Sequence, residues 1–394
     1  MLIPLELAPL TAAECAHAAR VRAALSAALT AAGGWLPFST CMQLLLYAPG
    51  LGYYAAGARK FGEGGDFVTA PEVSAVFGRC LATQCAEVLG ALGGGEILEL
   101  GAGSGALARE LLIELARVGR LPARYRILEV SPELRARQQQ QVAALPGELA
   151  GRVHWEERVP AGPLRGVVLA NEVLDALPVE RFRITASGVE ELGVEYTGES
   201  FRWRARPAGA ALAAAVAAIA ADRGAPLPEG QVGEACLRLG PWLAAVTAPL
   251  TAGVALFLDY GCARGEYYAA VHAAGTLACF HRHRRHDDPF INLGLQDLTA
   301  WVDFTRVAEA GVAAGLEVAG YTSQANFLLA NDFEHHLARL RSEVAPAEEP
   351  LCARAAARLV LPADMGERFK CIALARDRSA PLAGFRLRDY RHTL

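Results

Sequence analysis

The chain has 394 residues, of which 53% are hydrophobic and 20% are charged, and its formal net charge at pH 7 is −4. This length predicts roughly two or three domains, and the large apolar fraction excludes an intrinsically disordered chain. The acidic balance argues against a general nucleic-acid binder, because such domains are usually basic. Prolines and glycines interrupt the two long uncharged stretches, 23–58 and 239–258, so we expect no membrane insertion.

The nine cysteines form no CxxC pair, and an odd number without a disulfide framework is typical of reduced thiols. The first residues lack a basic segment ahead of an apolar one, which argues against a secretory signal. Arginine far outnumbers lysine, and alanine and glycine are abundant, as in proteins of GC-rich bacterial genomes. These features predict a bacterial, cytoplasmic protein.

The N-terminal region, residues 1–95, is predicted to be helical. An alanine-rich helix is expected over 11–31, and a short apolar helix ends at Tyr47. A glycine-rich loop follows at 61–71, and apolar residues then recur at helical spacing over 72–92. The glycine-rich loop therefore joins two helical segments.

Residues 96–180 form the first part of a predicted α/β core. Short apolar segments alternate with helical patterns, which predicts a parallel sheet with helices on both faces. The expected strands are 97–100, 125–130, 153–155 and 167–170, and the expected helices are 106–118 and 132–142. The predicted fold class is α/β, with a Rossmann-like core.

The alternation of strands and helices breaks after residue 180. Alternating apolar residues over 181–206 predict an antiparallel meander, which forms an insertion over 181–240 together with an alanine-rich helix. The second part of the core, 241–394, includes an irregular loop at 262–296. In this part we expect strands at 254–258, 316–321 and 369–374, and helices at 297–314 and 331–359.

The sharpest local signal is the run of Glu99, Gly101, Gly103 and Gly105 between a predicted strand and a predicted helix. Glycines there allow a tight turn and let a ligand approach the main chain at a helix N-terminus. The run also satisfies the loose dinucleotide pattern G-x-G-x-x-G/A. A carboxylate at Glu99 can hold the amino group of a methionine moiety, whereas it would repel a pyrophosphate. We therefore favour S-adenosylmethionine (SAM) as the ligand, with a dinucleotide site or a structural turn as alternatives.

Glu129 ends the second predicted strand of the core. In open α/β sheets the ligand lies at the carboxyl ends of the strands. An acid at this position can bind both ribose hydroxyls of SAM. The alternative is a solvated acid ahead of Ser131 and Pro132, which are typical of a helix start.

Asn171, Glu172 and Asp175 follow the fourth predicted strand, at the same edge of the sheet. Asn171 is a polar donor at the strand exit. Glu172 and Asp175 are three residues apart, so they could converge on one cation if 173–175 starts a helical turn. Acids are also common at ordinary helix starts, and that alternative stays open.

Gly65, Asp66, Phe67 and Thr69 belong to the glycine-rich loop. Helix capping accounts for Thr69 and for the proline that follows it. It does not account for the glycine, the aspartate and the phenylalanine ahead of them. The residues alone leave open whether this loop contacts a ligand.

His281, His283, His286, Asp287 and Asp288 have side chains of the kind that bind metals. Zinc sites, however, use defined ligand pairs on rigid elements, and three interleaved arginines would repel a metal ion here. We therefore expect no metal. The loop is better explained as a basic segment that contacts an acidic partner or packs over the active site.

Several motifs together resemble the MidA family of class I SAM-dependent methyltransferases. This family includes the mitochondrial protein-arginine methyltransferase that is an assembly factor for respiratory complex I. The resemblance runs in order over nearly the whole chain, in segments 42–54, 65–78, 99–105, 171–179, 259–261, 297–304 and 365–370. The segments that contain Gly65 and Asn171 are the most family-specific, whereas the glycine run is shared by the superfamily.

The resemblance implies a seven-stranded Rossmann-like sheet whose last strand, 369–374, is antiparallel. It also implies that the loop from Gly65 to Thr69 folds over SAM. The expected cofactor-binding residues are then Gly65, Asp66, Phe67, Thr69, Glu99, Gly101, Gly103, Gly105, Glu129 and Asn171.

We therefore predict a SAM-dependent methyltransferase that acts on arginine side chains of a protein, with a respiratory complex subunit as one candidate. Arginine stays protonated at physiological pH, so carboxylates must orient its guanidinium. The candidate catalytic residues are Glu172, Asp175 and Asn171. A small-molecule methyltransferase and a non-catalytic binding or assembly factor are the alternatives. The expected partner is a protein rather than a nucleic acid, and a homodimer is left open.

Overall fold

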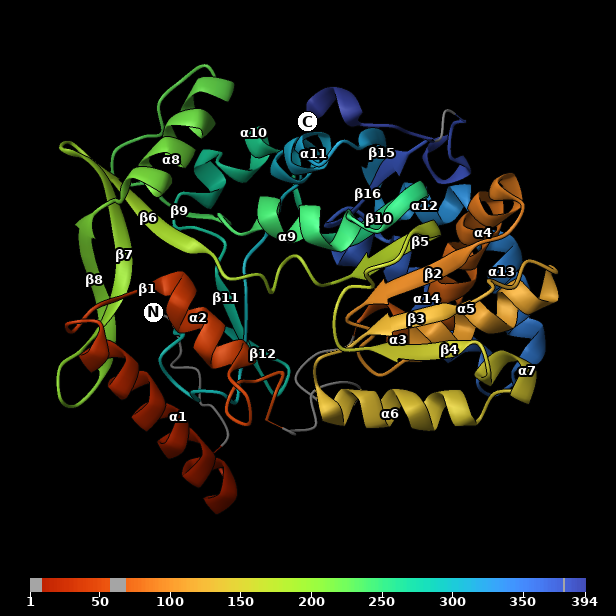
Figure 1. The fold of residues 1–394 in the computed structure, drawn as a ribbon, viewed down its shortest axis with the longest axis horizontal. Coiled ribbons are helices and arrows are strands. Elements are labelled where there is room, and N and C mark those ends of the chain that lie inside the picture. Colours follow the sequence, from red (N-terminus) through yellow and green to blue (C-terminus); the bar gives the residue numbers. More distant parts are fainter. Residues whose placement is uncertain (1–8, 57–68, 378–379) are drawn as a thin grey trace. The chain divides into compact units, whose positions relative to one another are not determined.

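The computed structural model describes residues 9–56, 69–377 and 380–394 (Figure 1). The chain divides into two compact units, each assembled from three segments. Unit 1 consists of Met1–Phe67, Asp175–Arg238 and Arg264–Trp301, and unit 2 consists of Val68–Leu174, Leu239–Ala263 and Val302–Leu394. Unit 1 thus contains most of the predicted N-terminal region, the insertion and the loop from His281 to Asp288, here called the histidine-rich loop.

Unit 2 is built on an eight-stranded sheet in the order β15-β16-β10-β5-β2-β3-β4, with β14 paired to β10. Its strands are β2 (Glu96–Leu100), β3 (Tyr125–Leu128), β4 (Val153–Glu156), β5 (Leu164–Asn171), β10 (Leu250–Cys262), β14 (Val302–Asp303), β15 (Glu317–Ser323) and β16 (Phe369–Arg376). Neighbours from β4 to β10 are parallel, whereas β16 is antiparallel to both β10 and β15. The predicted fold class and its antiparallel last strand are confirmed, and the short β14 is an addition.

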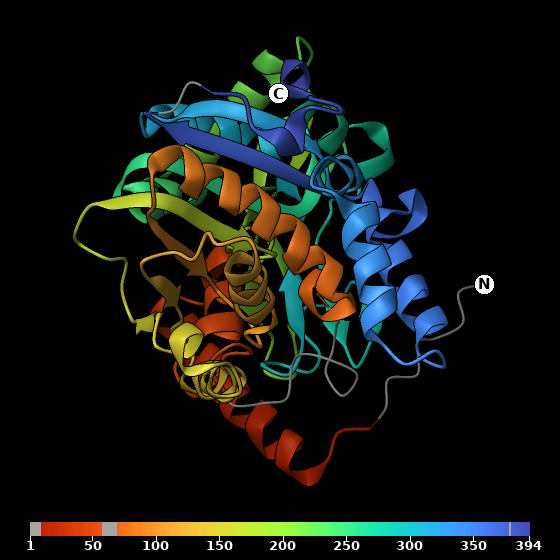
Figure 2. The ribbon, with the colours of Figure 1, turned by 90° about the vertical axis from the view of Figure 1, so that its right-hand side faces the viewer.

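Helices cover both faces of this sheet, because its strands are apolar on both sides. Their bounds are α3 (Ala70–Val73), α4 (Ala75–Leu92), α5 (Ala106–Arg117), α6 (Pro132–Ala143), α7 (Gly147–Ala150), α9 (Leu239–Thr247), α11 (Phe304–Ala313), α12 (Gln324–Ala330), α13 (Phe333–Glu343) and α14 (Glu349–Val360). Val167 and Leu256 face the core shared with α4 and α5. On the other face, Phe257 lies against Trp242 of α9. Figure 2 shows α4, in orange, beside the blue helices α13 and α14.

Helix α4 is long and apolar enough to cross a membrane, but 61% of its span is buried inside the structure. Such burial is typical of a core helix. The helix begins later than predicted because Ser74 has an extended backbone and its side chain accepts a hydrogen bond from Val76 N. This cap separates α3 from α4.

Two predicted helices of the C-terminal part need correction. The helix expected over 297–314 begins only at Phe304, because Asp303 is its N-cap and accepts a hydrogen bond from Arg306 N at 3.1 Å. The helix expected over 331–359 is divided into α13 and α14 around Pro346, which cannot continue a helix.

Unit 1 contains two small antiparallel sheets, ordered β1-β7-β6-β9 with β8 beside β7, and β12-β11-β13. Its elements are α1 (Ala12–Ala31), β1 (Leu36–Pro37), α2 (Phe38–Tyr47), β6 (Glu180–Thr185), β7 (Gly188–Tyr196), β8 (Phe201–Pro207), α8 (Ala210–Asp222), β9 (Val232–Ala235), α10 (Arg264–Tyr267), β11 (Ala278–His281), β12 (Arg284–His286) and β13 (Asp297–Thr299). Strands β6 to β8 are the predicted meander. The stretch 262–296, expected to be irregular, contributes β11 and β12.

Candidate active site

The glycine run lies at the carboxyl end of β2, where the chain turns into α5. Gly101, Gly103 and Gly105 have φ angles of 63°, 54° and 86°, which residues with side chains rarely adopt. A Cβ on Gly101 would lie 3.2 Å from Val173 Cγ2, and one on Gly105 would lie 3.2 Å from Gln138 Cα. The run therefore requires glycine both for its backbone conformation and for its close packing.

Glu99 is buried in β2, with 2% of its surface exposed. Tyr125 Oη of the neighbouring β3 donates a hydrogen bond to Glu99 Oε2 at 2.8 Å. Burial raises the pKa of Glu99, and the charge of Glu129 raises it further, whereas the hydrogen bond from Tyr125 lowers it. The resulting pKa is about 7. A bound ammonium group would favour the charged carboxylate again. Tyr125 was not predicted as a site residue. The signal in the sequence that could have indicated it is a polar aromatic side chain within an apolar strand.

Glu129 follows β3 and is 6% exposed. Its Oε1 accepts a hydrogen bond from Ser131 N at 2.8 Å, and its Oε2 accepts one from Gln138 Nε2 at 2.9 Å. Ser131 also caps α6 through its side chain. The carboxylate is therefore buried and oriented beside the glycine run, so the alternative of a solvated acid is wrong.

Asn171 ends β5, and Glu172 follows it with a φ of 53°, an uncommon value for a residue with a side chain. Glu172 Oε1 accepts hydrogen bonds from Ala70 N at 3.2 Å and from Asn171 Nδ2 at 3.0 Å. The Glu172 carboxylate thereby connects the exit of β5 to the start of α3. Asn171 Oδ1 is buried and has no hydrogen-bond partner among the described residues.

Asp259 of β10 holds the loop that carries Glu172. Its Oδ2 accepts hydrogen bonds from Val173 N at 3.1 Å and from Leu174 N at 2.8 Å. No helix starts at 173–175, so the condition under which Glu172 and Asp175 could converge on one cation from a helical turn is not met. The sequence indicated Asp259 only as the end of a strand, so its positioning role was missed.

The two candidate catalytic acids belong to different units, Glu172 to unit 2 and Asp175 to unit 1. Asp175 is 6% exposed, and its backbone carbonyl accepts a hydrogen bond from Ala300 N at 3.0 Å. Thr69 precedes α3 as its N-cap, without a side-chain hydrogen bond. The other predicted residues of the glycine-rich loop, Gly65, Asp66 and Phe67, lie outside the described residues.

The histidine-rich loop is the β11–β12 hairpin of unit 1. His281 Nδ1 lies 2.7 Å from Leu295 O, and Arg282 Nη2 donates to Glu14 Oε1 of α1 at 2.8 Å. Within the described ranges, no group of histidine, cysteine, aspartate or glutamate side chains could hold a metal ion. The Arg282–Glu14 ion pair therefore attaches this loop to α1.

A sheet of this strand order, with an antiparallel strand beside β10 and a glycine turn after β2, defines the class I fold of SAM-dependent methyltransferases. A family model described as S-adenosyl-L-methionine-dependent methyltransferase matches residues 80–322. The chain belongs to this family, the MidA family of SAM-dependent methyltransferases, and its cofactor is SAM.

Relatives match over most of the chain. A crystal structure of a protein from Burkholderia thailandensis bound to S-adenosyl-homocysteine is 42% identical, covers 99% of this chain and 100% of that chain, and has a TM-score of 0.91. The mitochondrial protein arginine methyltransferase NDUFAF7 homolog of Drosophila melanogaster is 28% identical over 86% of this chain and 82% of its own length. The protein arginine methyltransferase NDUFAF7 of Homo sapiens is also 28% identical, over 84% of this chain and 78% of its own length.

Proposed function

We propose that this methyltransferase transfers the methyl group of SAM to an arginine side chain of a protein. The names of its eukaryotic relatives support a protein arginine as the acceptor. The observation that carries the proposal is Glu172, a carboxylate held directly after β5 by Ala70 N and Asn171 Nδ2, with Asp175 as a second acid three residues further on. A cationic acceptor needs such acids, whereas a neutral small molecule does not.

The residues at the carboxyl edge of the unit 2 sheet fit SAM. We assign the buried Glu99 to the amino group of its methionine moiety and Glu129 to its ribose hydroxyls. The glycines of the run let SAM approach the protein main chain, and Asn171 Oδ1 offers an acceptor that has no partner among the described residues. The bound cofactor supplies an electrophilic methyl group on a sulfonium. We also assign to it the residues of the glycine-rich loop, Gly65, Asp66, Phe67 and Thr69.

The chain must hold a guanidinium in line with that methyl group. Arginine keeps its proton, with a pKa above about 12, so a carboxylate is needed to bind and orient it. Glu172 is our first candidate for this role, with Asp175 as the second acid and Asn171 at the transfer edge. One terminal nitrogen forms the new N–C bond as the C–S bond breaks, and the bonding electrons leave with sulfur. The same nitrogen releases one proton, which a carboxylate passes to solvent.

Alignment of the two reactants is the main contribution expected from the protein, because proximity and orientation alone lower such barriers substantially. The experiment is incubation of the purified protein with methyl-labelled SAM and a cell lysate, followed by acid hydrolysis of the labelled protein fraction. Label in methylarginine is the expected result. Label confined to small molecules, or to another amino acid, would contradict the proposal.

A further inference from the structure

A run of four glutamines occupies residues 138–141 of α6. Its last three members are exposed, whereas Gln138 is fully buried. Gln138 Nε2 donates to Glu129 Oε2 at 2.9 Å and to Gly103 O at 3.0 Å. Gln138 Oε1 accepts a hydrogen bond from Trp155 Nε1 of β4 at 3.0 Å. One side chain thus connects the predicted ribose acid to the glycine run.

We propose that Gln138 is a positioning residue that fixes the Glu129 carboxylate for the ribose of SAM. Trp155 Nε1 donates to the oxygen of the same amide, which orients the amide so that Nε2 faces Glu129 and Gly103. Without Gln138, Glu129 would keep its charge and the hydrogen bond from Ser131 N, but it would lose the contact that fixes Oε2. The proposal depends on the cofactor role of Glu129 and not on the identity of the acceptor.

A double-mutant cycle tests this role by calorimetric titration of S-adenosylhomocysteine. Gln138→Met should weaken binding about tenfold in the wild-type background and less than about twofold in Glu129→Ala, because the two residues act through one contact. Gln139→Met is the matched exposed control and should bind as the wild type. Equal losses in both backgrounds, or no loss in Gln138→Met, would overturn the proposal.

Discussion

The fold strongly alters the acid–base chemistry of Glu99. Its pKa of about 7, caused mainly by burial, means that the free protein carries a largely neutral Glu99 below pH 7. If Glu99 pairs with the amino group of SAM, binding must release a proton below that pH. The affinity for SAM is then coupled to pH through this one carboxyl group.

We predict that SAM binds more tightly as pH rises from 6 to 7.5, by at most about tenfold for each pH unit below the Glu99 pKa. Glu99→Gln should bind SAM more weakly and should lose this dependence, because a glutamine has no proton to release. Calorimetry across this range provides the measurement. A wild type whose affinity does not change with pH would show that Glu99 does not pair with the amino group.

The sequence indicates candidate binding residues at the ends of strands, but it does not indicate residues that act through another residue. Glu99 and Glu129 follow apolar strand residues, which signals a sheet edge. Gln138 looks like one of four equivalent glutamines, and Asp259 looks like an ordinary strand end. Their roles depend on which atoms they meet across the fold.

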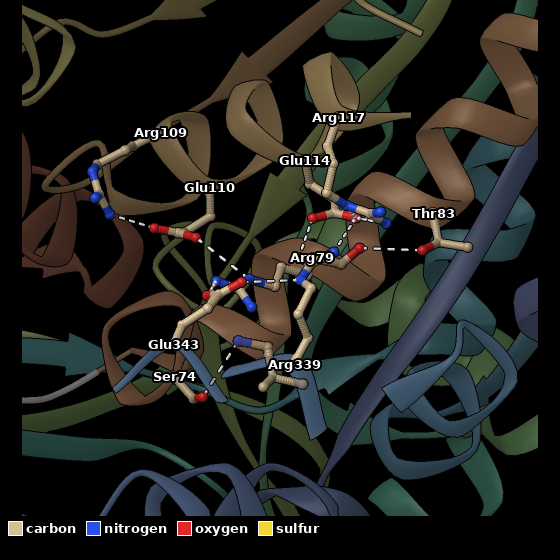
Figure 3. Close-up of polar contacts among 10 residues, drawn as sticks. Ser74, Arg79, Thr83, Arg109, Glu110, Glu114, Arg117, Arg339 and Glu343 are labelled. Atoms are coloured by element: carbon tan, nitrogen blue, oxygen red, sulfur yellow. Dashed lines mark hydrogen bonds and ion pairs between the residues drawn. The ribbon is translucent and has the colours of Figure 1, made fainter. Parts of the chain in front are cut away.

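At the scale of elements, a network of charges fastens α13 to α4 and α5 (Figure 3). Glu114 of α5 accepts hydrogen bonds from Arg339 Nη1 of α13 at 3.0 Å and from Arg117 Nε at 2.9 Å. Arg79 of α4 is paired with Glu343 of α13. Burial raises the pKa of Glu114, but hydrogen bonds from Arg339 and Arg117 outweigh it and lower the pKa to about 2.

We predict that Glu114→Gln lowers the free energy of unfolding by on the order of 1–3 kcal/mol, because Arg117 and Arg339 both lose their ion pair with this buried carboxylate, although Arg339 keeps Glu343. The Glu114 contribution should be complete above pH 4.5, the usual pKa, and should disappear as pH falls through about 2. Denaturant unfolding at several pH values measures both effects. Glu309→Gln, at an exposed surface pair, is the control, and an equal loss there would contradict the account.

The long strands of the unit 2 sheet were predictable because buried parallel strands are short apolar runs separated by helices. The β11–β12 hairpin of unit 1 was not. Its turn residues, Arg282 and His283, have φ angles of 49° and 60°, where a two-residue hairpin turn usually has asparagine and glycine. The sequence therefore lacks the usual turn signal, and only the strand pairing reveals the hairpin.

At the scale of the whole molecule, the proposed function assigns the acceptor guanidinium to Glu172. Glu172→Gln keeps a side-chain oxygen that can accept from Ala70 N and Asn171 Nδ2, but it removes the charge that would bind a guanidinium. We predict that methyl transfer to protein falls by roughly tenfold to hundredfold, while SAM affinity is unchanged. Labelled transfer and SAM calorimetry are measured in parallel, with the exposed Glu157→Gln as control.

The outcomes of this pair of measurements lead to different conclusions. Unchanged transfer in Glu172→Gln would contradict the guanidinium role. A loss of SAM affinity would instead place Glu172 among the cofactor-binding residues. Asp175→Asn should reduce transfer comparably if both acids hold the acceptor.

The most direct test of the account is the calorimetric titration of SAM into the wild type and into Gly101→Val. Gly101 and Gly119 have nearly equal φ angles of 63° and 64°, but a Cβ on Gly119 would meet nothing within 4 Å. Gly119→Val therefore controls for backbone strain alone. We predict that the wild type and Gly119→Val bind SAM and that Gly101→Val does not. Unchanged SAM affinity in a folded Gly101→Val would contradict the placement of the cofactor at the glycine run.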